Sequence, residues 1–316
     1  MAEGYKMKKW NYLFDVPDQK KVRMIVHADC KNESDDQFAL AHHLMTPKLI
    51  VKGIIGGHFN GNPQEFGVGQ TAAASTKEIH TILGLMGLEG AYPVLTGSEY
   101  PLEDEFTPRD NAAVRFIIEE AMKDDPHPLF IGMQGAVTDL ASAILIEPAI
   151  CSRMTCIWIG GGDYPKGARE FNLEMDIAAA NVLMKSEMPL WQVPMSTYKT
   201  VSVSLAELQY QVAPCGELGR YLFEHMVRYN QKKADDLHWP NGEIWGLGDS
   251  PTVGLLLTEQ ERTDLYDLMP APAIRYEDMT YDFTDSEGRR PVRVYKNVDP
   301  QLTLRDFYAK LHINFG

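Results

Sequence analysis

The sequence predicts an α/β fold, with a single domain in which helices cover a mostly parallel central sheet. Short apolar runs rich in β-branched residues recur along the chain, and each is followed by a loop and a helical pattern. These runs are apolar throughout, which is typical of parallel strands buried on both faces. No internal repeat and no linker rich in Pro, Gly or Ser divides the 316 residues. We therefore expect residues 1–316 to form one domain around a large core.

The first strand and helix set the pattern. Residues 22–28 (VRMIVHA) form an apolar run that predicts a buried strand, and apolar residues recur at helical spacing over 35–45. The later strands are expected at 49–55, 92–95, 128–132, 154–159 and 189–193, and the later helices at 68–84, 111–123, 139–147 and 176–185. The last third is less regular, with helices expected at 216–230 and 252–257 and a strand pair at 273–276 and 292–295.

Composition limits the partners of the protein. The chain has 44 acidic and 30 basic residues, a formal net charge of −14, whereas nucleic acid and anionic membranes attract clusters of Lys and Arg. The longest apolar runs, 49–55 and 253–257, are too short to cross a bilayer, and the N-terminus does not resemble a signal peptide. Four cysteines are too few for a disulfide framework and lack the spacing of a zinc site. We expect a cytoplasmic protein that binds neither nucleic acid nor membranes.

The densest group of functional side chains follows the first strand, in residues 27–44 (HADCKNESDDQFALAHHL). Asp29 stands where that strand ends, and Asp35 and Asp36 open the next helix. Open parallel sheets bind ligands at the carboxyl ends of their strands, and three carboxylates there suit a hard cation such as Ca²⁺ or Mg²⁺. Simple capping of the helix would explain the same residues without a ligand. Neither EF-hand spacing nor a phosphate-binding P-loop is present.

Further polar motifs follow in order: residues 53–60 (GIIGGHFN), 92–97 (YPVLTG), 131–140 (IGMQGAVTDL), 158–172 (WIGGGDYPKGAREFN), Asp176 with its paired alanines, and 248–251 (GDSP). Together with Asp29 and the Asp35-Asp36 pair, they resemble the motifs of the inosine-uridine-preferring nucleoside hydrolase family, from its opening D-x-D-x-G-x-D-D to its late "HDP". The resemblance covers about residues 22–260 and implies a nucleoside-hydrolase-like fold.

Three departures indicate a divergent member of that family. Five residues separate Asp29 from the Asp pair, where the family has three. His27 stands at the first Asp of the opening motif. Gly248 replaces the His of "HDP", which some members use to protonate the leaving group. The half of the site that holds metal and sugar is retained, while the half that recognises the base is rewritten.

The resemblance implies a calcium-dependent N-ribohydrolase, which splits a ribonucleoside or related riboside into ribose and free base. By the same resemblance Asp29, Asp36, Asp249 and the backbone carbonyl of Thr138 ligate Ca²⁺. Asp29 also takes the proton from the attacking water. Such a cation positions hydroxyls and activates water, and carboxylates suit this reaction because bond cleavage builds positive charge on the sugar.

The residues that the resemblance assigns to the sugar hydroxyls are Asp35, Asn60, Glu170 and Asn172. Each has a plainer interpretation. Asn60 precedes Gly61 and fits a turn, and a salt bridge with Arg169 would account for Glu170. Among the predicted metal ligands, Asp249 could likewise cap a helix that begins at the following Ser-Pro.

Two further residues are candidates for contact with the leaving base. His58 ends the second strand and could donate a proton, with an ordinary pKa near 6.5. Trp245 precedes Asp249 by four residues and could stack on a base, which would favour purines, although core packing explains it equally well. His42 and His43 lie in mid-helix, where we expect them to be solvated.

Two alternatives to an N-ribohydrolase remain from the sequence. One is a non-catalytic homologue that binds metal and sugar, which the missing "HDP" histidine favours. The other is a metal-dependent phosphohydrolase, which requires a Lys near a phosphate. The family resemblance implies a homodimer or homotetramer and a small-molecule riboside as partner.

Overall fold

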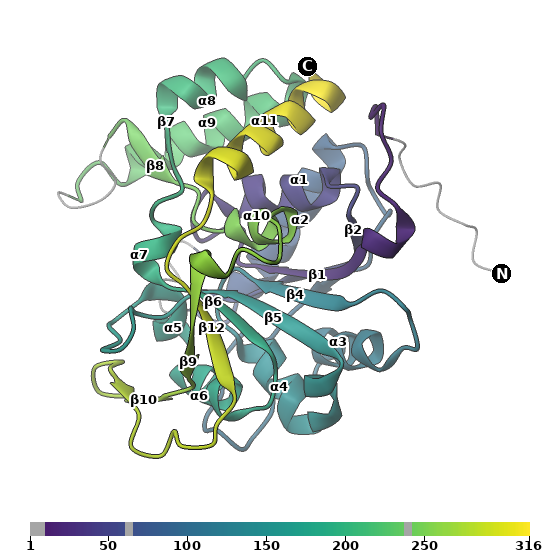
Figure 1. Cartoon of the computed structure of the whole chain (residues 1–316). Helices are drawn as coiled ribbons and strands as arrows, with labels where there is room; N and C mark the ends of the chain where they lie inside the picture. The colour runs from purple at the N-terminus through teal and green to yellow at the C-terminus, as the bar shows by residue number, and fades with distance from the viewer. Residues whose placement is uncertain (1–9, 61–65, 237–241) are drawn as a thin grey trace.

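A computed structural model of the chain describes residues 10–60, 66–236 and 242–316. Within these ranges, eight strands form one sheet in the order β3 (Val94–Thr96), β2 (Leu49–Gly56), β1 (Val22–Ala28), β4 (Leu129–Met133), β5 (Met154–Ile159), β6 (Leu190–Val193), β12 (Pro291–Tyr295) and β9 (Tyr266–Pro270). The strands from β3 to β12 are parallel, and β9 runs antiparallel to β12. The predicted single α/β domain with a mostly parallel sheet is confirmed (Figure 1).

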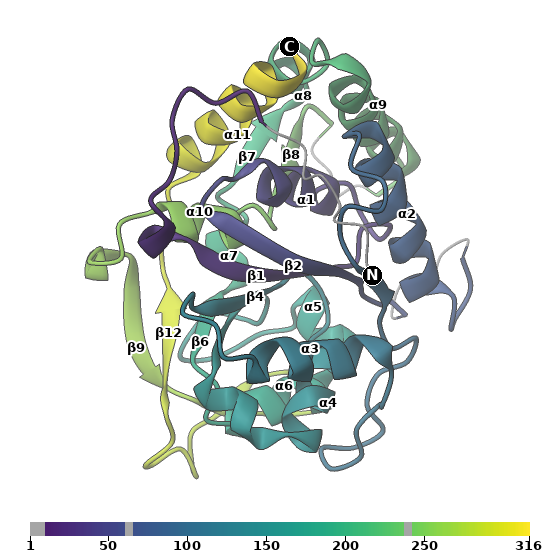
Figure 2. The same cartoon turned by 90° about the vertical axis from the view of Figure 1, so that its right-hand side faces the viewer.

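Helices cover both faces of this sheet, as Figures 1 and 2 show. One face is covered by α1 (Asp36–Met45), α2 (Thr71–Leu85), α9 (Gly216–Lys232), α10 (Pro251–Leu257) and α11 (Pro300–Phe315). The other is covered by α3 (Ala112–Met122), α4 (Thr138–Ile146) and α6 (Ile177–Lys185). Shorter helices are α5 (Phe171–Met175), α7 (Met195–Tyr198) and α8 (Leu205–Gln211). Because strands such as β1 are buried along almost their whole length, their sequences are apolar without alternation.

The topology creates a crevice at the carboxyl ends of β1 and β4. The chain moves from β1 to β2 and β3 on one side and then crosses to β4 on the other. The loops that follow β1 and β4 therefore diverge, which is where open α/β sheets bind ligands. The loops that leave β5 and β6 end at the same edge, so four strand ends supply side chains to one place.

The last third differs from the predicted arrangement. The expected pairing of 273–276 with 292–295 is wrong: β10 (Ala273–Ile274) pairs with β11 (Tyr281–Asp282), while β12 inserts between β6 and β9. β12 thereby covers the edge that β6 would otherwise expose. Two helices that the sequence analysis did not predict, α8 and α11, pack in the same core as α1.

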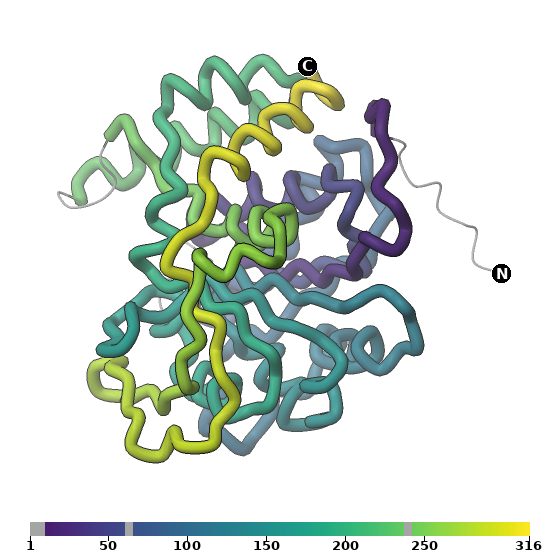
Figure 3. Tube along the Cα trace, viewed as in Figure 1, coloured from purple at the N-terminus to yellow at the C-terminus, as the bar shows by residue number. Residues whose placement is uncertain are grey.

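The two ends of the described chain meet beside α11, as the trace in Figure 3 indicates. The Asn11 backbone N–H donates to the side chain of Asn314 at 2.9 Å. The Tyr12 hydroxyl donates to the Met45 carbonyl at 2.6 Å and so fastens the same segment to the end of α1. In the part of the chain described here, no helix combines the length and apolarity needed to cross a bilayer.

Candidate active site

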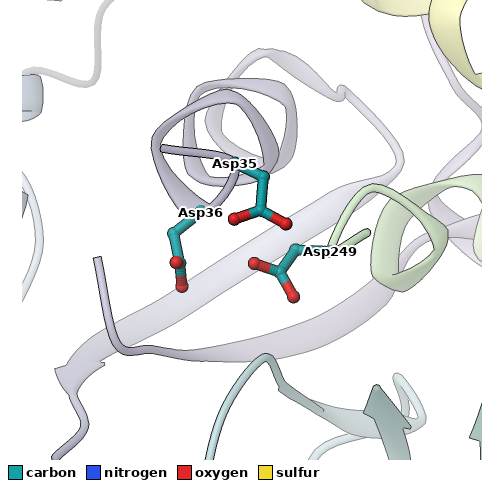
Figure 4. A group of neighbouring side chains, drawn as sticks. All are labelled: Asp35, Asp36 and Asp249. Atoms are coloured by element: carbon teal, nitrogen blue, oxygen red, sulfur yellow. The ribbon is translucent and has the colours of Figure 1, made fainter. Parts of the chain in front are cut away.

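Carboxylates from distant parts of the sequence meet at this edge of the sheet. Asp35 and Asp36 lie at the start of α1, and Asp249 lies just before α10. One oxygen of each lies within 4.8 Å of the others, and Figure 4 shows the three side chains pointing toward a common space. Asp29, at the end of β1, lines the same cleft. The structure therefore brings together the four carboxylates that the opening and closing motifs supply.

Burial and mutual repulsion raise the pKa values of these carboxyls. Burial, and next the nearby Asp35, raise the pKa of Asp29 to about 8. Burial, helped by neighbouring carboxylates, holds the pKa values of Asp36 and Asp249 well above their ordinary range. The pKa of Asp35 rises only to about 6, because backbone N–H groups of its own loop and of the segment before α10 offset part of the burial. A bound cation would offset both the burial of these carboxylates and the repulsion between them.

The donor set fits a metal ion. Within the described ranges, Asp29 Oδ2, Asp36 Oδ1 and Gln134 Oε1 are buried and have no hydrogen-bond partner, although buried polar atoms are nearly always bonded. All three atoms are oxygens on residues that line the cleft. Hard cations such as Ca²⁺ and Mg²⁺ prefer oxygen ligands of this kind.

Glu170 forms another wall of the cleft and is held rigidly. Its carboxylate accepts backbone N–H groups from Gly161 at 2.7 Å, Leu173 at 3.0 Å and Asn172 at 3.2 Å. The Tyr198 hydroxyl donates to it at 2.8 Å. Burial raises the pKa of Glu170, and these four hydrogen bonds offset part of that rise.

The plainer interpretation of Glu170, an ion pair with Arg169, is wrong. The Arg169 guanidinium instead donates to Glu174 at 2.8 Å on the surface. Asn172 is the next polar residue of the wall, and its side-chain N–H group donates to the carbonyls of Gln134 at 3.1 Å and Ile159 at 2.9 Å. It thus joins the loops that follow β4 and β5.

Two glycines allow the walls to approach one another. A Cβ at Gly135 would lie 2.9 Å from Asp29 Cγ, so Asp29 can occupy its place only beside a glycine. A Cβ at Gly248 would lie 3.1 Å from the Tyr198 ring and 3.4 Å from an Asp35 oxygen. The ring of Tyr198 therefore lies against the position where the family motif has a histidine.

Asn60 lies outside the lining of this cleft. Its side-chain oxygen accepts the Gly69 N–H at 3.1 Å and the Thr71 hydroxyl at 3.0 Å. These bonds hold the segment that leads into α2. Gly61, the partner in the turn considered from the sequence, is outside the described residues.

His58 and Thr138 are also absent from the lining and bond to each other. The Thr138 hydroxyl donates to Asp176 at 2.7 Å, so His58 Nε2–H is the donor in its 2.7 Å bond to Thr138. Burial lowers the pKa of His58 to about 4, which leaves it neutral and a poor proton donor near neutral pH. Gln134 lines the cleft and offers a neutral side-chain oxygen there, whereas the predicted ligand Thr138, through its backbone carbonyl, is not among the lining residues.

Trp245 belongs to the core. It lies on β8 (Ile244–Gly246), is 2% exposed, and packs edge-on against Tyr229 with ring centroids 5.4 Å apart. It does not line the cleft, so the structure favours the packing interpretation over stacking on a base. His42 and His43 are also buried, contrary to the solvated positions expected for them.

Sequence reasoning missed four polar residues that line the cleft: Asn32, Glu33, Gln134 and Tyr198. Gln134 directly follows β4, and Tyr198 ends the short helix after β6. The strand-end rule that selected Asp29 could have found both. Asn32 and Glu33 lie in the five-residue gap before Asp35, which we had considered only as a departure in length.

Comparison with known proteins agrees with this geometry. The sequence model of the family "Inosine-uridine preferring nucleoside hydrolase" matches residues 24–304. The inosine-uridine preferring nucleoside hydrolase of Crithidia fasciculata is 31% identical over 196 residues, which is 53% of this chain and 58% of that protein. The pyrimidine-specific ribonucleoside hydrolase RihA of Salmonella arizonae is 22% identical over 254 residues, 71% of this chain and 74% of RihA.

Solved structures share the fold. A purine-preferring ribonucleoside hydrolase from Gardnerella vaginalis superposes with a TM-score of 0.69 at 18% identity, over 92% of this chain and 98% of the other. The type III effector XopQ, solved with adenosine diphosphate ribose, superposes with a TM-score of 0.65 at 16% identity, over 93% of this chain and 94% of the other.

Proposed function

Because this chain belongs to the inosine-uridine preferring nucleoside hydrolase family, and is therefore a ribonucleoside N-ribohydrolase, we propose that the cleft lined by Asp29, Asp36 and Asp249 is its reaction centre and that Ca²⁺ is its metal. The observation that carries this proposal is the convergence of the Asp35, Asp36 and Asp249 oxygens in a cleft that Asp29 also lines, with buried oxygens of Asp29 and Asp36 left without partners. Gln134 would complete the ligand set in place of Thr138.

Each wall of the cleft has a distinct part in the reaction. When bound, the cation would hold sugar hydroxyls and make a water molecule more acidic. Asp29, which lines the cleft, takes the proton of that water. Asp35, Glu170 and Asn172 hold the sugar, and their negative charge and dipoles stabilise the positive charge that develops as the N-glycosidic bond breaks. The bonding electrons leave with the base, which then takes up a proton.

The lining argues against the phosphohydrolase alternative. Among the described residues that line the cleft there is no Lys or Arg, whereas phosphoryl transfer depends on cationic groups around the phosphate. A homodimer or homotetramer and a cytoplasmic location are kept as proposals. Cys30, Cys151, Cys156 and Cys215 are buried and form no disulfide, as in proteins of reducing compartments.

The test is release of reducing sugar from a panel of purine and pyrimidine ribonucleosides, with and without EDTA and with Ca²⁺ restored. Asp29→Asn keeps the shape of the side chain and removes the base, so kcat should fall roughly 10²–10⁴-fold. Bound metal is measured alongside, because part of the loss could come from weaker metal binding. The control is Asp285→Asn, an exposed position far along the chain. Full turnover with normal metal content would exclude Asp29 as the base, and sugar binding without turnover in the wild type would favour the non-catalytic alternative.

A further inference from the structure

A second cleft lies between the loop after β1 and the helices α2 and α9, which run side by side in Figure 2. We call it the α2/α9 cleft. One part, of about 230 Å³, is lined by Lys31, Phe66, Tyr221, His225, Arg228, Tyr229 and Lys232. A second part, of about 510 Å³, shares Lys31 and Phe66 and adds α2 residues that include Lys77 and Glu78.

The α2/α9 cleft is basic although the chain as a whole carries a charge of −14. Lys31, Lys77, Arg228 and Lys232 all line it. Among the described residues that line it, the one carboxylate is Glu78, which is buried and already accepts Lys31 Nζ at 2.9 Å. Arg228 has a partner in Glu224 at 3.4 Å, but both side chains are more than half exposed, and such pairs contribute little.

The pKa of the His225 imidazole reflects the positive charges around it in the cleft. Burial, and next the charges of Lys31, Arg228 and Lys232, lower its pKa to about 4, although Glu78 opposes them. Three cations therefore act on one buried point. An anion placed there would be attracted by all of them.

The loop of residues 29–35, between β1 and α1, joins this cleft to the acidic cleft of the candidate active site. The hydroxyl of Ser34 bonds His225 Nδ1 at 2.7 Å, and Lys31 lies 3.4 Å from the other ring nitrogen. The neighbouring residues Asn32 and Glu33 line the acidic cleft. One short loop thus forms a wall of both clefts, and a ligand seated in one lies next to the other.

The chemistry of the lining points to a phosphate group. Arg228 can bind two phosphate oxygens through its planar guanidinium, and Lys31 and Lys232 add point charges. We propose that the α2/α9 cleft binds phosphate, and that the preferred substrate is a riboside that carries one. The assignment of a phosphate-bearing riboside as substrate rests on the proposed hydrolase function, whereas phosphate binding does not.

Phosphate binding is tested directly by calorimetric titration with inorganic phosphate and pyrophosphate. The double variant Arg228→Ala/Lys232→Ala should weaken binding roughly tenfold or more, since charge-assisted bonds are lost. The control is Arg153→Ala/Arg220→Ala, which removes the same charge from exposed positions outside the cleft. No saturable binding by the wild-type protein, or equal weakening in both double variants, would overturn the site.

The source of the phosphate is tested with inosine and inosine 5′-monophosphate. If the phosphate belongs to the substrate, the ratio of kcat/KM for the monophosphate to that for inosine should fall about tenfold in Arg228→Ala/Lys232→Ala. An unchanged ratio in a variant that has lost phosphate binding would overturn the substrate assignment and leave the site for a separate phosphate ligand. Absence of any hydrolysis by the wild type would count against the proposed function alone, because the titration needs no turnover.

Discussion

Glu170 shows how much of a residue's role depends on partners that the sequence does not display. Three of its four hydrogen bonds come from backbone N–H groups, which fix its position, and the fourth comes from Tyr198, whose ring needs the space left by Gly248. An ionised carboxylate is a stronger acceptor for a sugar hydroxyl than a protonated one. In the proposed reaction, Tyr198 acts on the sugar through the charge of Glu170.

Replacing Tyr198 by Phe tests this link. The hydroxyl hydrogen bond lowers the pKa of Glu170, so its loss should raise that pKa. The rise of KM on the acid side of its pH profile should move to higher pH. Tyr210→Phe, at an exposed position, is the control. Superimposable KM–pH profiles for Tyr198→Phe and wild type would show that Glu170 does not bind the substrate.

Six of the residues chosen from the sequence line the cleft: Asp29, Asp35, Asp36, Glu170, Asn172 and Asp249. The other candidates, Asn60, His58, Thr138 and Trp245, lie outside this lining. The end of a strand tells which edge of the sheet a residue reaches, but not which way the following loop turns. His58 and Thr138 bond to each other instead, and Trp245 is large and apolar enough to be drawn into the core.

At the scale of elements, α2 and α9 both form hydrogen bonds with the loop of residues 29–35, through Glu78 and His225. Glu78 of α2 accepts Lys31 Nζ at 2.9 Å, Gln37 Nε2 at 3.4 Å and the Tyr221 hydroxyl of α9 at 2.5 Å. These bonds fasten the segment between Asp29 and α1, in which five residues separate Asp29 from Asp35 where the family motif has three. The longer loop has more conformational freedom to lose on folding, and the network restricts it.

Glu78→Ala should therefore weaken metal binding without unfolding the protein. It releases Lys31, a cation beside the metal loop, and removes the anchor of that loop. Loss of such supporting partners typically costs about 10–100-fold in metal affinity. The measurement is Ca²⁺ affinity by competition with a chelator, with circular dichroism to establish folding. Glu119→Ala, on the exposed face of α3, is the control. Unchanged Ca²⁺ affinity in a folded Glu78→Ala protein would show that the hydrogen bonds of Glu78 do not support the metal site.

Helices and strands were predicted correctly where the apolar pattern was regular. An element was missed where only a capping residue and a proline marked its start. The helix α11 was missed although Asp299 caps it, accepting the Leu302 N–H at 2.9 Å, and Pro300 occupies its first turn. Both are recognised helix-start signals. The position of β12 could not be predicted in this way, because its pairing with β6 joins segments about a hundred residues apart and leaves no local trace.

At the scale of the whole molecule, α1 and α11 close one face of the sheet around buried histidines. His42 Nε2 bonds Asp306 of α11 at 2.7 Å, and His43 Nδ1 donates to the Ala39 carbonyl at 2.7 Å. Burial lowers the pKa of His42 to about 4 and that of His43 to about 3. Both imidazoles are neutral in the folded protein, whereas the unfolded chain takes up protons on them below about pH 6.5.

The folded state should accordingly lose stability as the pH falls from about 6.5 toward 4, because the unfolded state binds more protons there. At pH 5 each histidine should cost about 1–2 kcal/mol of unfolding free energy relative to pH 7. Denaturant unfolding of His43→Gln at both pH values should show a smaller loss than wild type. The exposed His80→Gln should match wild type, and an equal pH dependence in all three proteins would contradict the assignment.

The distance in sequence between the two halves of the acidic cluster has a consequence for synthesis on the ribosome. The chain is made from its N-terminus, so Asp29 and Asp36 emerge long before Asp249 and the strand β12. Asp249 has to join Asp36 before their oxygens can surround an ion, and α11, the last helix, then packs on α1. A nascent chain that stops short of α10 carries the first motif but no complete ion site. Metal uptake thus follows translation of most of the chain, and incomplete products remain inactive.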